Sequence, residues 1–214
     1  MDFSLPESCI KALNSLPASE STKTKLCDYV SLLHKWNQKT NLTGSKSTEE
    51  IASDHVLDSL LAAKHLPVTE ALIDIGTGAG FPGLVLAMVW TDREIHLVEP
   101  KEKSVIFLKE AVKNLGLQNV RVHPLSVEDL QGDELVPIYQ ESFTISRAFS
   151  PMKKFFGYCD YLVHEDAPLF LMTGENSESL DQTVLEKSNL LVFKSTNYDS
   201  SKPKKILVEI RPKE

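Results

Sequence analysis

Four closely spaced glycines follow a short apolar segment in the first half of the chain. The segment 72–75 reads Leu-Ile-Asp-Ile, and the glycines are Gly76, Gly78, Gly80 and Gly83. The apolar run predicts a buried strand, and Pro82 is typical of a first helical turn, where a proline loses no hydrogen bond. Glycine also lets backbone N–H groups approach a ligand closely. The stretch therefore predicts a strand, a glycine loop and a helix, the unit that cradles a nucleotide in an open α/β sheet.

Two classes of nucleotide ligand fit a loop of this kind. Read from Gly78, the loop is G-x-G-x-x-G, the dinucleotide pattern. Read from Asp74, it is D-x-G-x-G-x-G, which is typical of methyltransferases that use S-adenosylmethionine. In the dinucleotide pattern the first glycine directly follows the strand, and the sequence from Gly76 does not fit it. A strand-end carboxylate also suits the ammonium and sulfonium of S-adenosylmethionine. We therefore expect Asp74, Gly76, Gly78 and Gly80 to bind this methyl donor.

Further polar side chains follow the later predicted strands. Glu99 comes about twenty residues after the loop, where a carboxylate accepts hydrogen bonds from ribose hydroxyls or caps the next helix. Val127 would pack on an adenine face, and Glu128 would read its exocyclic amine. Arg147 would hold a guanine edge, a phosphate or the cofactor, or pair with a carboxylate. The four positions define a ligand site at the carboxyl ends of the strands.

The sequence around Arg147 indicates which kind of atom accepts the methyl group. It reads Ser-Arg-Ala-Phe at 146–149, without the N-P-P-Y type of motif that activates an exocyclic amine, and the chain has no Pro-Cys pair for attack on a pyrimidine. A ring nitrogen with a free lone pair, such as guanine N7, needs neither device. Catalysis would then consist of alignment and electrostatics.

Beyond residue 68, predicted strands and helices alternate. Strands are expected at 72–75, 94–98, 120–123, 143–145, 169–172, 190–194 and 206–210, and helices at 101–114 and 152–163, with a polar loop at 198–203. This order predicts an α/β fold with a mostly parallel sheet and helices on both faces. Residues 68–214 are expected to form this single compact domain.

Residues 1–67 are expected to form an N-terminal helical extension. Helices are predicted at 5–16, 19–36 and 47–66, with a loop at 37–44, and a capping box from Ser47 to Glu50 starts the third. On that helix, His55 and Asp58 share a side.

The composition indicates the cellular compartment and the kinds of partner that the protein can have. The 214 residues carry a net charge of -7, and 42% of them are hydrophobic, which is enough for a core. The three cysteines form no C-x-x-C pair, which argues against zinc and for a reducing compartment. No start of the signal-peptide type and no membrane-spanning apolar run is present, so we expect a cytoplasmic protein without membrane or metal. If RNA is the partner, local basic patches must bind it; candidates are Lys23, Lys25, Lys35, Lys39, Lys46, Lys101, Lys103, Lys153, Lys154, Lys202, Lys204, Lys205, Arg211 and Lys213.

Three motifs flank the glycine loop in a fixed order. They are W-N-x-x-x-N-L-T from Trp36, H-x-x-D-S from His55, and S-R-A-F from 146. Together they resemble the RsmG (GidB) family of bacterial 16S ribosomal RNA guanine-N7 methyltransferases over nearly the whole chain. The resemblance implies a class I S-adenosylmethionine-dependent methyltransferase with a Rossmann-like sheet. It also implies methyl transfer to N7 of a guanine in a decoding-centre loop of 16S rRNA, either free or within the 30S subunit.

Carried over by motif, Gly76, Phe81, Val127, Glu128 and Arg147 would contact the cofactor. Asn37, Asn41, His55 and Asp58 would line the mouth of the site, so Arg147, Asn41, His55 and Asp58 are the candidate catalytic residues. Ser126 and Thr173 stand where family members often have a basic residue.

Structural roles are the alternative for the N-terminal motifs. Trp36 would be core, the asparagines would cap turns, and His55 would bond to Asp58. Alternative functions are methylation of a small molecule, which the acidic composition favours, and a non-catalytic role in ribosome assembly. The sequence leaves the oligomeric state open.

Overall fold

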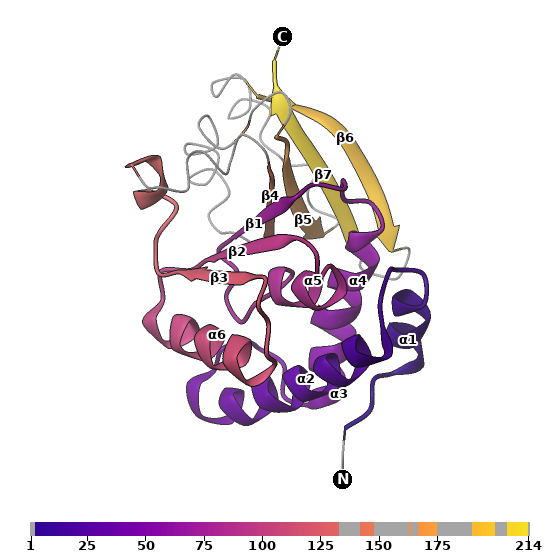
Figure 1. Ribbon diagram of the computed structural model, residues 1–214. Coiled ribbons are helices and arrows are strands. Elements are labelled where there is room, and N and C mark those ends of the chain that lie inside the picture. The colour runs from indigo at the N-terminus through magenta and orange to yellow at the C-terminus, as the bar shows by residue number, and fades with distance from the viewer. Residues whose placement is uncertain are drawn as a thin grey trace.

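The computed structural model describes residues 3–132, 142–147, 163, 167–174, 190–199 and 205–213. Within them, seven strands form one sheet in the order β3-β2-β1-β4-β5-β7-β6 (Figure 1). The first five strands run parallel to one another, and β7 and β6 add an antiparallel pair at one edge. The strands are β1 Ala71–Ile75, β2 Glu94–Val98, β3 Val120–His123, β4 Ser142–Arg147, β5 Leu169–Gly174, β6 Leu190–Asp199 and β7 Lys205–Pro212.

The strand order reverses at β1: β2 and β3 follow on one side of it, and β4 and β5 lie on the other side. This strand lies between β2 and β4, and its last residue, Ile75, is paired with Val98 on one side and Ser146 on the other. The connections that leave β1 and β4 therefore diverge, and the crevice between them is where open α/β sheets bind their ligands. The register brings the loop after β1 level with Arg147 at the end of β4.

The predicted strands are confirmed, with ends that coincide or differ by at most five residues. The prediction of a polar loop at 198–203 is wrong for its first two residues, because Tyr198 and Asp199 belong to β6. Irregularities in the β6–β7 pairing at 192–194 and 197–199 interrupt the alternation of apolar and polar residues that would mark a strand. The predicted helix at 152–163 lies outside the described residues except for Val163, which is in neither helix nor strand.

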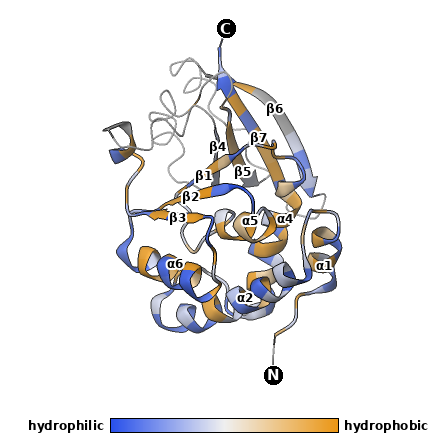
Figure 2. Cartoon of the chain, viewed as in Figure 1, coloured by the Kyte–Doolittle hydropathy of each residue, from blue (hydrophilic) through white to orange (hydrophobic). Residues whose placement is uncertain are grey.

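Helices α1 to α6 gather on one side of the sheet (Figure 1). Helix α5 packs on β1 and β2, and both α2 and α4 pack on α5. Every residue of α5 is buried, as expected for a helix that is apolar all round. Figure 2 shows the apolar residues concentrated along the strands and α5. The helices are α1 Glu7–Leu13, α2 Glu20–Thr40, α3 Thr48–Ile51, α4 Leu57–Ala63, α5 Gly83–Val89 and α6 Glu102–Asn114, with a π-helix, η1, at Ala52–Val56 and a 3₁₀ turn, η2, at Asp129–Gly132.

The helix predicted at 19–36 continues to Thr40, so the prediction of a loop from 37 is wrong for the first four residues. No glycine or proline interrupts that stretch. The helix ends at Asn41, whose φ is 52°. This is the left-handed conformation that asparagine tolerates at a helix end. The third predicted helix contains the π-helix η1, and only half of its capping box forms. Ser47 accepts from the Glu50 N–H, whereas the Glu50 carboxylate accepts from the Lys46 N–H.

Gly83 is needed where α5 meets the sheet. A Cβ at this position would overlap the Leu97 side chain and lie 2.7 Å from Asp74 Oδ2, whereas a Cβ at Gly44 would meet nothing within 4 Å. We expect Gly83→Ala to lower the free energy of unfolding by about 1–3 kcal/mol through overpacking. Gly44→Ala is the matched control and should change it little. Urea denaturation measures both, and equal stabilities would contradict this account of the contact.

Candidate active site

The glycine loop after β1 adopts the conformation that its sequence predicts. Gly76, Gly78 and Gly80 have φ values of 71°, 59° and 102°. Residues with a side chain rarely adopt such values. Glu99 holds the loop, because its Oε2 accepts from the Gly78 N–H at 2.9 Å while its Oε1 accepts from the Lys101 N–H at 2.9 Å. The buried Glu99 carboxylate thus ties the loop to the start of α6. It lies at the strand end, where the sequence predicted a ribose contact.

Asp74 is the second carboxylate at the loop and is fully buried. Its Oδ2 accepts from the Thr77 hydroxyl at 2.5 Å and from the Gly83 N–H at 2.8 Å. Its Oδ1 has no hydrogen-bond partner among the described residues. Burial raises the pKa of Asp74 to about 7, against the lowering effect of these two hydrogen bonds. The free oxygen is therefore suited to a cationic group that enters the loop.

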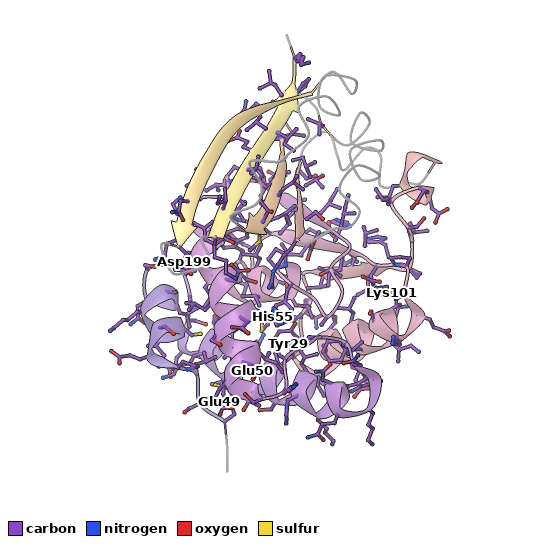
Figure 3. The ribbon with its side chains drawn as sticks, turned by 180° about the vertical axis from the view of Figure 1, so that it is seen from behind. Tyr29, Glu49, Glu50, His55, Lys101 and Asp199 are labelled. Atoms are coloured by element: carbon purple, nitrogen blue, oxygen red, sulfur yellow. The ribbon has the colours of Figure 1, made fainter. Side chains whose placement is uncertain are left out.

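The N-terminal helices brace the same loop. The Tyr29 hydroxyl of α2 donates to the Ala79 carbonyl oxygen at 2.6 Å. The Phe81 ring lies between two others, with centroids 5.5 Å from Tyr29 and 4.8 Å from His55. Figure 3 shows Tyr29 and His55 close together, with Lys101 at the start of α6. The Phe81 side chain is buried in this packing.

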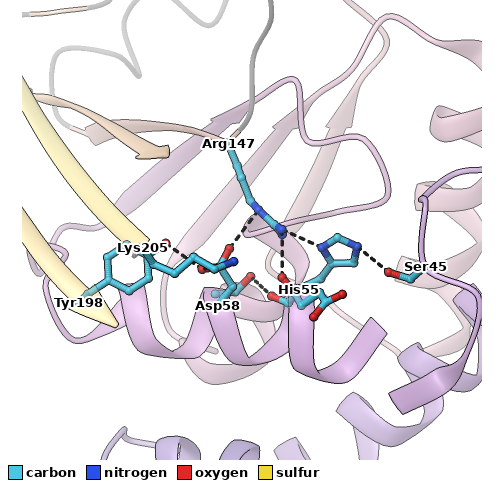
Figure 4. Close-up of polar contacts among 8 residues, drawn as sticks. Ser45, His55, Asp58, Arg147, Tyr198 and Lys205 are labelled. Atoms are coloured by element: carbon cyan, nitrogen blue, oxygen red, sulfur yellow. Dashed lines mark hydrogen bonds and ion pairs between the residues drawn. The ribbon is translucent and has the colours of Figure 1, made fainter. Parts of the chain in front are cut away.

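Arg147 joins β4 to the π-helix η1 (Figure 4). Its Nε lies 3.1 Å from Asp58 Oδ2, and its Nη2 donates to the Asp54 carbonyl oxygen at 3.0 Å and to His55 Nδ1 at 2.7 Å. The alternative in which Arg147 pairs with a carboxylate is thus confirmed. The predicted bond between His55 and Asp58 is wrong, because each of them bonds to Arg147 instead. A π-helix shifts the backbone hydrogen bonds by one residue, and here the Asp54 carbonyl accepts from the guanidinium.

His55 is neutral in this arrangement. Burial is the main cause that lowers the pKa of His55 to about 4, and the Arg147 charge adds to it. Because Nδ1 accepts from Arg147, the ring proton lies on Nε2, which donates to Ser45 Oγ at 3.1 Å. Both ring nitrogens are therefore engaged, and His55 positions Arg147 and the 42–46 loop.

Asn37 shapes the loop that carries Ser45. Its Nδ2 donates to the carbonyl oxygens of Thr43 and Ser45 at 3.0 and 2.8 Å, and its Oδ1 accepts from the Thr43 N–H at 2.8 Å. Asn41 ends α2 and is exposed. Asn37 therefore has the turn-stabilising role that was the structural alternative, whereas for Asn41 the structure shows the backbone conformation of a helix end. Trp36 is half-buried, packs edge-on against Phe107 and donates to Glu110 at 3.3 Å.

Asp58 is contacted by three donors from the second half of the chain. This buried carboxylate accepts from the Tyr198 hydroxyl at 2.8 Å and lies 3.6 Å from Lys205 Nζ, in addition to its contact with Arg147 (Figure 4). Tyr198 is itself buried, and the Asp58 carboxylate adds to the desolvation that raises the pKa of its hydroxyl. Sequence reasoning missed both partners from β6 and β7. The apolar Val208 and Ile210 give β7 a strand pattern, but nothing local links it to Asp58.

Val127 and Glu128 follow β3 as predicted. Val127 is buried and Glu128 is exposed, immediately before the 3₁₀ turn η2. Ser126 caps this turn, since its N–H and hydroxyl both donate to Asp129 Oδ2, at 3.1 and 2.5 Å. A capping hydroxyl thus stands where relatives often have a basic residue, and contacts of Val127 and Glu128 to an adenine stay a prediction.

The described part of the chain contains no cluster of three or more His, Cys, Asp or Glu side chains arranged to hold a metal ion. None of its helices combines the length and apolarity that crossing a bilayer requires.

Solved structures show the same fold. A ribosomal protein L11 methylase from Lactobacillus delbrueckii subsp. bulgaricus matches with a TM-score of 0.57 and 11% identity, covering 80% of this chain and 81% of its own. A SAM-dependent methyltransferase from Aquifex aeolicus matches with a TM-score of 0.55 and 20% identity, covering 72% of this chain and 88% of its own. The fold is therefore that of class I methyltransferases, as the sequence predicted.

Sequence comparisons identify the family. The model of the GidB family, described as rRNA small subunit methyltransferase G, matches residues 22–206. The ribosomal RNA small subunit methyltransferase G of Dichelobacter nodosus is 36% identical over 177 residues, which are 83% of this chain and 82% of the relative. That of Vibrio campbellii is 36% identical over 160 residues, 75% of this chain and 73% of the relative. The chain therefore belongs to the GidB family of small-subunit ribosomal RNA methyltransferases.

Proposed function

We propose that this protein transfers a methyl group from S-adenosylmethionine to N7 of a guanine in 16S ribosomal RNA. The observation that carries the proposal is the glycine loop with its buried, half-satisfied Asp74, set level with Arg147 at the end of β4. Family membership supplies the substrate class. The choice of N7 as the methylated atom rests on the S-R-A-F motif and on the lack of any amine-activating motif in the sequence.

The loop fits the methyl donor in charge and in space. Asp74 Oδ1 is a buried acceptor suited to the donor's ammonium. At Gly78 a Cβ would meet no atom within 4 Å, so the space beside the backbone is open to a ligand. We infer that Asp74, Gly76, Gly78, Gly80 and the Phe81 backbone hold the methionine part. Glu99 would hold the ribose, while Val127 and Glu128 would hold the adenine. When bound, the sulfonium supplies an electrophilic methyl carbon.

Arg147 would orient the guanine or its phosphate. Its contacts with the described residues use Nε and Nη2, and we propose that Nη1 donates to the substrate. Guanine N7 carries no proton, so the reaction needs no general base. This agrees with a His55 whose two nitrogens are already engaged. A purine methylated at N7 is cationic, and the Asp58 carboxylate beside Arg147 would reduce the repulsion between guanidinium and product.

The N-terminal residues would complete the site. We propose that residues 1–67 form an extension of the catalytic domain, residues 68–214, and that Asn41 contacts the RNA from the end of α2, where it is exposed. A 16S rRNA substrate, either free or within the 30S subunit, implies a cytoplasmic reaction.

Methyl transfer to defined RNA tests the proposal. The purified chain is incubated with radiolabelled S-adenosylmethionine and either naked 16S rRNA or 30S subunits from cells that lack the activity. Label should enter the rRNA, and chemical strand scission specific for 7-methylguanine should map it to one position. Transfer to a small molecule without labelling of rRNA would favour the metabolite alternative. Binding of rRNA without binding of the cofactor would favour an assembly factor.

Substitution of Gly78 separates cofactor binding from backbone strain. Gly78 and Gly116 have φ values of 59° and 61°, and a Cβ at either would meet nothing within 4 Å. Alanine at each should therefore lower stability by a similar amount, about 1 kcal/mol. We expect only Gly78→Ala to weaken binding of S-adenosylhomocysteine, by at least tenfold in calorimetry. Equal affinity in the two variants would place the cofactor away from this loop.

Cofactor affinity should depend on pH through Asp74. The ammonium of S-adenosylhomocysteine needs the ionised carboxylate, whose pKa is raised to about 7. Affinity should therefore fall roughly tenfold per pH unit below about pH 7 and level off above it. In Asp74→Asn it should be weaker and nearly independent of pH, as measured by calorimetry between pH 5.5 and 8.

The ligand-free chain gives a second measurement on Asp74. Because its folded pKa is raised, Asp74 favours folding at low pH, and this contribution is lost as pH rises from about 4 to about 7. The unfolding free energy of the unsubstituted chain should fall relative to Asp74→Asn across that window. If the unfolding free energies of the two proteins instead changed in parallel with pH, Asp74 would be ionised in the folded chain throughout this window and the account would be wrong.

A further inference from the structure

A cleft of about 770 Å³ lies between α1, α4 and the β6–β7 edge of the sheet. Four cationic side chains line it, from four separate elements: Lys11 of α1, Lys64 after α4, Arg147 of β4 and Lys205 of β7. Figure 1 shows how α1 and α4 approach the ends of β6 and β7. Lys205 is among the basic candidates predicted from the sequence, whereas Lys11 and Lys64 are not, because only the fold brings these lysines together.

Cations outnumber carboxylates in the lining of this cleft, although the whole chain is acidic. Arg147 and Lys205 pair with the buried Asp58, so the cations to consider for a ligand are Lys11 and Lys64. Two carboxylates, Asp54 and Asp199, share the lining with the four cations, whereas the complete sequence has a net charge of -7. Lys64 is exposed and has no ion pair among the described residues. Lys11 Nζ lies 2.7 Å from Glu7 Oε1, but the two side chains are 73% and 79% exposed. Surface pairs of this kind contribute little, so both lysines are available to an anion.

One wall of the cleft is apolar. Ala12, Leu57 and Leu61 line it between the lysines, and both leucines are only partly buried. Single-stranded nucleic acid is bound by a positively charged groove that follows its backbone, beside side chains on which unstacked bases pack. Here the side chains beside the cations are aliphatic rather than aromatic. In an A-form duplex the bases are stacked inside the helix, so none of them can pack against these apolar side chains.

The cleft is continuous with the candidate active site through Arg147. The guanidinium lines the cleft, contacts His55 and Asp54, and lies 5.9 Å from the centre of the Phe81 ring in the glycine loop. We propose that the cleft binds the phosphodiester backbone of single-stranded RNA adjoining the target guanine, with Lys11 and Lys64 on two of its phosphates. This inference rests on the proposed function and specifies how the substrate reaches the site.

The test uses two pairs of exposed lysines. Lys11→Gln with Lys64→Gln removes the cleft charges outside the catalytic cluster. Lys109→Gln with Lys113→Gln is the matched control: it removes the same charge, both residues are exposed on α6 one turn apart, and neither is among the basic residues predicted to contact RNA. Neither control residue lines the cleft. Exposed substitutions of this kind change stability little, which thermal unfolding checks.

Binding of 16S rRNA is measured by filter retention between 50 and 300 mM salt. In the cleft variant the slope of log Kd against log salt should be smaller by about 1.4, since each phosphate contact on a single strand contributes about 0.7. The control variant should keep the slope of the unsubstituted chain. When the RNA concentration is varied, the KM for RNA should rise several-fold in the cleft variant, while kcat should be unchanged. Poly(U) should compete with rRNA better than an A-form duplex of equal length.

Two results would overturn the inference on its own. One is a cleft variant with the salt slope and KM of the control, while the unsubstituted chain still methylates rRNA. The other is stronger competition by the duplex than by poly(U). Failure of the unsubstituted chain to methylate rRNA in any form would instead overturn the proposed function, and the RNA cleft with it.

Discussion

The ion pair between the buried Asp58 and the partly buried Arg147 is the interaction on which the site depends. It joins a helix near the N-terminus to the last residue of β4. Removing a charged pair from water is costly, and such a pair persists only when further hydrogen bonds satisfy its atoms. Here Tyr198 and Lys205 approach the carboxylate, while His55 and Asp54 accept from the guanidinium. The pair therefore fixes Arg147 only when helices, parallel strands and edge strands are all in place.

Two buried carboxylates at the site differ because their partners differ. Asp58 has an arginine and a lysine within 4 Å. Among the described residues, Asp74 has only a hydroxyl and a backbone N–H as hydrogen-bond donors, both to Oδ2, and its Oδ1 has none. Burial without a cation raises a carboxyl pKa, and a cationic ligand would reverse that effect. Cations of the protein itself thus pair with Asp58, whereas at Asp74 the proposed cofactor would supply the cation.

The sequence predicted what local patterns determine. The order of strands and helices and the glycine loop follow from apolar runs, glycine spacing and one proline, and the structure agrees with them. It did not predict the π-helix at 52–56, since no local residue pattern distinguishes one shifted turn from an ordinary helix. Nor did it predict that Tyr198 would meet Asp58. That contact depends on a strand pairing that two irregularities hide from the alternation of residue types.

The acidic composition favoured a small-molecule substrate, and the structure explains why net charge is a poor guide here. At physiological ionic strength, exposed charges more than about 8 Å apart are largely screened. A phosphate in the cleft between α1 and α4 therefore interacts with the lysines and carboxylates that line it far more than with acidic residues elsewhere. Lys11 and Lys64 are 53 positions apart in the sequence, so counting charges along the chain cannot reveal their proximity. The local field depends on tertiary packing, and an acidic chain can thus hold a basic path for RNA.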